Sequence, residues 1–208
     1  MVELSDLQRD ALGEIFNIGV GRAAAGLSQL VRDEVVLSTP SVLICHASAA
    51  HNELLGSGLR QLSAVSQEYS GPFGARVMLV FPEAHALEIV RLMVGVTDMS
   101  IEELSEFQQE AMCEVGNIIL NACMSALADM FHVELEGSLP EHHFGDSNTL
   151  IWHNSSAQKE ASALLLLQVD MYISDHSIHG EIVFLMSVTS LAKLLDHVDR
   201  YLAAHGFV

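Results

Sequence analysis

Hydrophobic and polar residues follow a helical period in two long stretches of the chain. When consecutive residues are placed about 100° apart, the turn angle of an α-helix, each stretch separates into an apolar side and a polar side. The apolar sides consist of Leu12, Ile15, Phe16, Gly19, Ala23, Gly26 and Leu30, and of Met112, Val115, Gly116, Ile119, Cys123, Ala126 and Met130. The polar sides consist of Asp10, Glu14, Asn17, Gly21 and Ser28, and of Glu110, Glu114, Asn117, Asn121 and Ala128. We therefore predict two long amphipathic helices, whose Gly- and Ala-rich apolar sides allow close packing.

The two stretches are copies of one module. The positions that recur 100 residues apart are Glu14 and Glu114, Asn17 and Asn117, and Pro40 and Pro140. An internal repeat indicates a duplicated structural unit. We expect one domain over residues 1–208, built from an internal repeat of residues 5–97 and 100–205, because no Pro/Gly/Ser-rich linker separates the halves.

The first half is predicted to contain a long helix, a strand that continues past Pro40, a hairpin and a second helix. Ser5 is a suitable N-cap for the long helix, which ends near Val31. We expect a helix at 5–31, strands at 35–37 and 42–45, a hairpin of the strands 59–69 and 73–81, and a helix at 82–94. The segment 46–58 is ambiguous and contains a short helix at 49–55.

The second half repeats this order. Ser100 and Glu103 form a capping box for a helix that ends near Phe131. The remaining expected elements are a strand at 133–137, a polar, mixed segment at 141–154, a hairpin of 161–174 and 178–187, and a closing helix at 188–204. The predicted fold class is therefore α+β (mixed α/β), a single domain of two pseudo-symmetric halves with a shared, antiparallel-rich sheet and two long motif-bearing helices.

Composition narrows the range of partners. Of the 208 residues, 50% are hydrophobic, which predicts a compact globule. Nine basic against 27 acidic residues give a formal net charge of −18, which argues against nucleic acid and anionic membranes. Apolar runs such as 163–167 are too short for membrane insertion. Three cysteines without a signal peptide indicate reduced thiols and a cytoplasmic location.

The chemistry-bearing residues are the repeated carboxylate and carboxamide. On one helix, an exposed Glu and Asn three residues apart are ordinary surface residues. Two copies of the same pair, each followed by a proline at the same distance, favour a function. Asn is also a mediocre helix former, so a repeated Asn in mid-helix needs a reason.

The pattern Asp/Ser-x3-Glu-x2-Asn-x22-Pro resembles the signature of the CheC/CheX/FliY family of chemotaxis phosphatases. The first copy matches it in full with Asp10, Glu14, Asn17 and Pro40. The second copy matches in Glu114, Asn117 and Pro140 and departs from it at Glu110. Two motifs over the whole chain resemble the CheC form, and we expect no flagellar-switch domain of the FliY type.

The resemblance implies a protein aspartyl-phosphate phosphatase whose substrate and partner is a phosphorylated CheY-like response regulator. It implies catalytic roles for Asn17 and Asn117, which orient a water, and for Glu14 and Glu114, which pair with the regulator's lysine. The remaining expected site residues are Asp10 and Glu110 in support, and Ile18, Ile118, Gly21 and Asn121 on the partner-binding face. The chain itself is expected to bind no cofactor, since the Mg²⁺ belongs to the partner regulator.

Two other functions compete with this one. The alternative is a non-catalytic adaptor for a response regulator or for a CheD-type receptor deamidase, and a more remote one is a structural part of the flagellar switch. A metal site is not expected, because His142 and His143 are adjacent and point in different directions, although Asp146 and His153 share their loop. Phe16 replaces Gly116 of the second copy, but its helical angle predicts a core position that leaves the first site open.

Overall fold

The computed structural model describes residues 4–38, 40–46, 61–95, 100–152, 162–173 and 176–207. The two long helices of the repeat are α1 (Asp6–Val31) and α4 (Ile101–Phe131). Each begins with a capping box, formed by Ser5 with Gln8 and by Ser100 with Glu103, which satisfies backbone N–H groups that a helix start leaves unpaired. Both therefore begin where the sequence predicts.

One antiparallel sheet of eight strands carries both halves of the chain. The strands are β1 (Val35–Leu37), β2 (Ser41–His46), β3 (Leu62–Ser70), β4 (Ala75–Pro82), β5 (Glu136–Gly137), β6 (Glu141–Gly145), β7 (Ser162–Ile173) and β8 (His176–Ser187). The order across the sheet is β1 and β2, then β7, β8, β4 and β3, then β5 and β6. The halves thus exchange their first strands, because β1 and β2 pair with β7 while β5 and β6 pair with β3.

The repeated prolines lie at a matching irregularity on the two edges of the sheet. Leu37 pairs with Met171 and Ser41 with Gln168, so the edge chain between these pairs is one residue longer than the β7 chain. The same insertion separates β5 from β6 opposite β3. Each proline comes directly before the strand that resumes pairing, a position where a missing N–H is tolerated.

At each irregularity a serine supplies hydrogen bonds that connect the edge chain to its neighbouring strand. The Ser38 N–H donates to the Asp170 carbonyl (2.8 Å), and the Ser38 hydroxyl accepts from the Asp170 N–H (2.9 Å). Ser138 makes the same two bonds to Glu68, at 2.9 and 3.0 Å. Ser38 and Ser138 are therefore a further repeated pair, which the sequence analysis missed.

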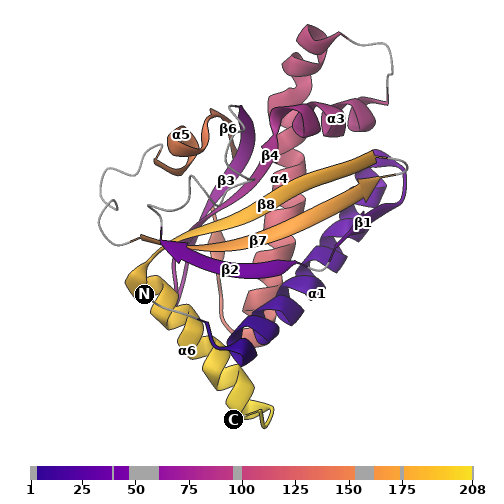
Figure 1. The fold of residues 1–208 in the computed structure, drawn as a ribbon. Helices are drawn as coiled ribbons and strands as arrows, with labels where there is room; N and C mark the ends of the chain where they lie inside the picture. The colour runs from indigo at the N-terminus through magenta and orange to yellow at the C-terminus, as the bar shows by residue number, and fades with distance from the viewer. Residues whose placement is uncertain are drawn as a thin grey trace.

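The helices α1 and α4 pack against each other and cover one face of the sheet, behind the strands in the view of Figure 1. Two more helices complete this layer. α3 (Glu83–Val94) follows β4, α6 (Val188–Ala204) follows β8, and both pack beside α1 and α4. The main core lies between this helical layer and the sheet. Although α4 is long and apolar enough to cross a membrane, 56% of its most apolar window is buried, so packing accounts for its composition.

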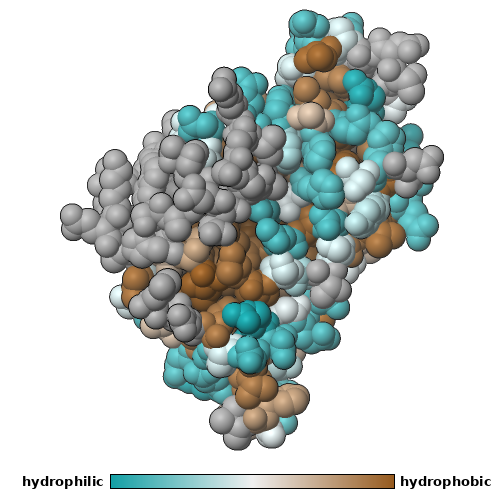
Figure 2. All heavy atoms as spheres, in the orientation of Figure 1, coloured by the Kyte–Doolittle hydropathy of each residue, from teal (hydrophilic) through white to brown (hydrophobic). Residues whose placement is uncertain are grey.

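The opposite face of the sheet is also apolar. Its buried cluster includes Ala64, Met78, Leu166 and Val183, together with Leu150 from the short helix α5 (Ser147–Trp152). Figure 2, which looks onto this face, shows hydrophobic residues gathered over the strands. The sheet is therefore buried on both sides along its central strands.

The sequence analysis differs from the structure at three segments. Residues 141–154 were expected to be polar and mixed, but they contain β6 and α5. The strand expected at 133–137 is reduced to Glu136–Gly137, and β8 begins at His176 rather than at Ile178. The polar side chains of β6 explain the error, because its backbone pairing to β3 leaves no alternating apolar pattern in Glu141–Gly145. The short helix expected at 49–55 lies outside the described residues.

Close contact between the two long helices depends on Gly19. A Cβ added at Gly19 would lie 2.8 Å from the Cα of Cys123 and 3.2 Å from the carbonyl oxygen of Ala122, both of them backbone atoms of α4. By contrast, nothing lies within 4 Å of a Cβ added at Gly13, two turns earlier on α1. The helices touch at Gly19 because this position has no side chain.

We predict that Gly19→Ala lowers the free energy of unfolding, because forcing the two helices apart costs about 1–3 kcal/mol. The matched control is Gly13→Ala, which should raise the free energy of unfolding by about 0.5–1 kcal/mol, since Ala replaces Gly inside a helix without a clash. Urea unfolding followed by circular dichroism measures both. Equal shifts for the two variants would contradict the close contact.

Candidate functional site

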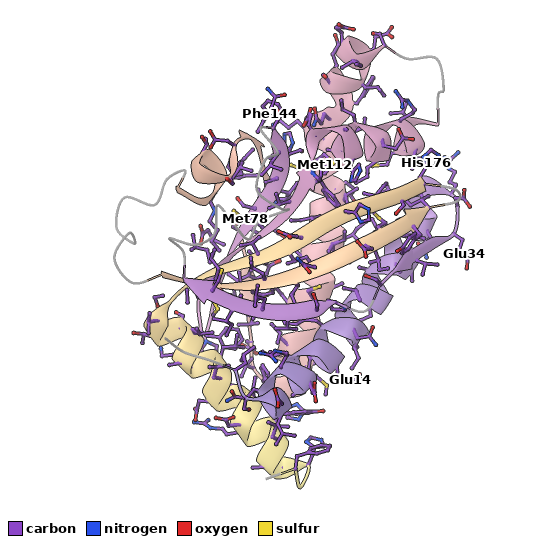
Figure 3. The ribbon with its side chains drawn as sticks, viewed as in Figure 1. Glu14, Glu34, Met78, Met112, Phe144 and His176 are labelled. Carbon is purple, nitrogen blue, oxygen red and sulfur yellow. The ribbon has the colours of Figure 1, made fainter. Side chains whose placement is uncertain are left out.

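The two copies of the motif are presented in the same way. Residues 9–20 and 109–120 show one identical sequence of exposed, half-buried and buried positions. Glu14 and Glu114 are exposed, whereas Asn17 and Asn117 are half-buried. In Figure 3 Glu14 lies on the side of α1 away from the strands, whereas Met112 of the second copy is fully buried. The predicted pairs therefore occupy equivalent outward faces of two rigid helices.

The carboxylate one turn before each pair is also on this face. Asp10 and Glu110 are both exposed, so the extra methylene of Glu110 projects into solvent. Gly21 is exposed as well, and a Cβ added there would meet nothing within 4 Å. The first site is thus flat beyond Asn17, while the second carries a half-buried Asn121 at the same place.

The two isoleucines beside the pairs belong partly to the core. Ile18 and Ile118 were expected outside the core face, but both are half-buried and pack against the main core. Ile118 reaches across to α1, where its Cγ2 lies 3.0 Å from the position of a Cβ on Gly26. Only part of each side chain remains for a partner, so a charged substitution here would also disturb the contact between helices.

Phe16 does not obstruct the first site, as the helical angle predicts. Its side chain is fully buried, and its ring centroid lies 5.2 Å from that of Phe184 on β8. At the equivalent Gly116, an added Cβ would clash with Val65 of β3. The two helices therefore meet the sheet at different distances, and Phe16 fills the wider gap on the inner side of α1.

In the second copy a hydrogen bond joins the motif asparagine to its neighbour one turn on. Asn121 Nδ2 donates to Asn117 Oδ1 at 2.7 Å. The Tyr69 hydroxyl, from β3, lies 2.8 Å from Asn121 Oδ1 and 3.0 Å from Gln67 Oε1. The sequence analysis missed Tyr69 and Gln67, because both lie on β3, far from the motif in the sequence and outside its pattern.

Cys113, directly before Glu114, serves the structure. Its thiol donates to the Pro140 carbonyl oxygen at 3.8 Å and so ties α4 to the chain before β6. Burial raises the pKa of Cys113, which keeps the thiol protonated near neutral pH. A protonated thiol is a poor nucleophile, so the site has no thiolate at this position.

The two histidines of β6 contact different serines of β3. His142 Nε2 contacts the Ser63 hydroxyl and His143 Nε2 contacts the Ser66 hydroxyl, each at 2.8 Å. Consecutive residues of a strand face opposite sides of the sheet, which separates the two rings. Within the described part of the chain no three His, Cys, Asp or Glu side chains gather as metal ligands; His153 lies outside it.

Comparison with known proteins agrees with the motif. Residues 7–44, which contain the whole first copy, match the model of the CheC-like family. The chain is 26% identical over 140 residues to the CheY-P phosphatase CheC of Bacillus subtilis, with 66% of each chain aligned. It is 28% identical over 139 residues to the flagellar motor switch phosphatase FliY of the same organism, with 66% of this chain and 36% of FliY aligned. These alignments span less than two thirds of either relative.

Solved structures share the fold. Thermotoga maritima FliY superposes with a TM-score of 0.75 at 19% identity, covering 96% of this chain and all (100%) of that one. CheX in the CheX–CheY–BeF3–Mg²⁺ complex of Borrelia burgdorferi superposes with a TM-score of 0.52 at 17% identity, covering 84% and 97%. The matched motif, the two relatives and the fold all show similarity to CheC-like proteins.

Proposed function

We propose that this protein is a phosphatase that hydrolyses the aspartyl phosphate of a CheY-like response regulator. The observation that carries the proposal is the repeated Glu–Asn pair, presented at identically exposed positions of α1 and α4. The relatives add support, since one of them is named a CheY-P phosphatase and a protein of similar fold was solved in complex with CheY. The fold alone would not suffice, because one fold serves many functions.

The asparagines are the proposed water-positioning groups. Phosphoryl transfer passes through a loose transition state, so catalysis consists mainly of positioning and charge stabilisation. A carboxamide both donates and accepts hydrogen bonds, and it can therefore hold a water in line with the phosphorus without acting as a base. A carboxylate at the same position would repel the phosphoryl group. Asn17 and Asn117 are half-buried, so the core supports their side chains from behind.

The glutamates are the proposed docking groups. Glu14 and Glu114 are exposed, one turn before the asparagines, and free to reach a cationic side chain of a partner. Pairing with the regulator's lysine would set the depth at which each carboxamide enters the partner's site. Asp10 and Glu110 extend the acidic face by one more turn and orient this contact. Mg²⁺ in this proposal is held by the regulator and neutralises phosphoryl charge.

The proposed division of labour predicts a narrow substrate range. The protein should speed the loss of phosphate from a phosphorylated regulator and leave p-nitrophenyl phosphate intact, because the lysine and the metal belong to the partner. Phosphate release from the purified regulator, with and without this protein, measures the first activity, and absorbance measures the second. Hydrolysis of the small monoester at a comparable rate would contradict the mechanism, whereas binding without faster dephosphorylation would indicate the adaptor.

The two sites should act independently. Asn17→Ala and Asn117→Ala should each leave measurable activity from the other site, and the double variant should fall to the regulator's own rate. The loss at a substituted site is expected to be on the order of 10²-fold, the effect of removing one preorganised hydrogen-bonding group.

Exposed glutamines on the same helices serve as matched controls. Gln29→Ala and Gln109→Ala each remove a carboxamide outside the motif and should leave the rate unchanged. Circular dichroism verifies that each variant is folded. Complete loss of activity in a folded single variant, Asn17→Ala or Asn117→Ala, would mean that only one site works.

A further inference from the structure

The second site is backed by a continuous line of polar groups that runs into the sheet. Asn117 contacts Asn121 at 2.7 Å, Asn121 contacts the Tyr69 hydroxyl at 2.8 Å, and this hydroxyl contacts Gln67 Oε1 at 3.0 Å. The line ends at the backbone, where Gln67 Nε2 donates to the Ser138 carbonyl oxygen at 2.9 Å. Its last member thus lies at the irregularity that the second edge strand forms before Pro140.

Proton counting shows how the line is connected. The Tyr69 hydroxyl has one proton and two amide oxygens as neighbours, so it cannot donate to both. Turning the amides of Asn117 and Asn121 by 180° exchanges N and O between the same two atomic positions. Each group then has a partner of the right kind: Asn117 donates to Asn121, Asn121 donates to Tyr69, and Tyr69 donates to Gln67. In either arrangement Asn117 keeps an N–H and an oxygen lone pair for a water.

The inner members of the line cannot move away. Tyr69 is 5% exposed and Gln67 2%. Gly137 lies against the tyrosine ring, since an added Cβ would be 2.8 Å from Tyr69 Cε1. Burial raises the pKa of Tyr69, so its hydroxyl stays protonated and available as a donor. Breaking the line at its buried members is costly, because a buried polar group that loses its partner is left unsatisfied.

The first site has none of these residues. Strand pairing aligns the halves there, since Leu37 faces Met171 as Gly137 faces Tyr69. The paired serine bonds of Ser38 to Asp170 and of Ser138 to Glu68 confirm the alignment one residue on. The counterparts of Asn121, Tyr69 and Gln67 are therefore Gly21, Met171 and Val169, none of which carries a side-chain N–H or O–H donor.

We infer that Asn121, Tyr69 and Gln67 form a positioning relay that holds the Asn117 carboxamide of the second site in one orientation. The inference rests on the proposed phosphatase function. It adds Tyr69 and Gln67 to the site and gives Asn121, which the sequence placed on the partner-binding face, the role of supporting Asn117. An amide held in place loses little rotational freedom when it binds the water. The gain therefore lies in kcat, while docking, which depends on Glu114, is unaffected.

The test places Tyr69→Phe in two single-site backgrounds. This change removes only the hydroxyl and keeps the ring against Gly137. In Asn17→Ala, where the second site alone works, kcat for the phosphorylated regulator should fall roughly two- to tenfold, the worth of one neutral hydrogen bond, with KM unchanged. In Asn117→Ala, where the first site alone works, the same change should leave kcat unchanged.

A second variant guards against a general effect of Tyr69→Phe on folding. Asn121→Ala in the Asn17→Ala background should lower kcat by a similar factor, and adding Tyr69→Phe to it should lower kcat no further, because both act through one line of bonds. The inference is overturned if kcat of the second site is unchanged by Tyr69→Phe, or if both backgrounds lose activity equally. Absence of activity in the unmodified protein would instead refute the proposed phosphatase itself.

Discussion

Close packing of α1 and α4 on a single sheet is the constraint on which the structure depends. The backbones approach at Gly19 and Cys123, where no side chain could be inserted on α1. With their inner sides fixed in this way, both helices turn Glu14 and Glu114 outward and hold the asparagines half-buried at the boundary of the core. A side chain at that boundary keeps its end in solvent while the core supports its base, and this arrangement suits the proposed water-positioning role.

The exchange of edge strands makes the halves inseparable. β1 and β2 complete the sheet beside β7, and β5 and β6 complete it beside β3. A half on its own would expose the side of β3 or β7 that the other half covers, with a row of unpaired backbone groups. The signature proline gains a structural meaning here, because with Ser38 or Ser138 it lies at the point where the edge chain accommodates one extra residue. At the second of these points the Ser138 carbonyl oxygen also accepts a hydrogen bond from Gln67 Nε2.

The two copies agree in their outer faces and differ in what lies behind them. Phe16 fills a gap against Phe184, whereas Gly116 allows Val65 to approach α4 directly. Behind Asn117 the sheet contributes polar Tyr69 and Gln67, and at the corresponding places in the first half it contributes Met171 and Val169. The two copies of the motif therefore carry the same Glu–Asn pair over parts of the sheet that differ in composition.

The sequence by itself determined the elements whose signals are local. The starts of α1 and α4 depend on capping residues three positions apart, and the helical faces depend on a period of 3.6 residues. The fold class and the final helix were correct for this reason, and the Glu–Asn pairs lie on the outer helix faces as predicted. Tertiary structure alone decided the exchange of edge strands, the pairing of β6, the inward packing of Ile118 and the contact of Tyr69 with Asn121, 52 residues apart. These features depend on strand register across the whole sheet, and register is set by long-range burial and backbone pairing that no short stretch of sequence encodes.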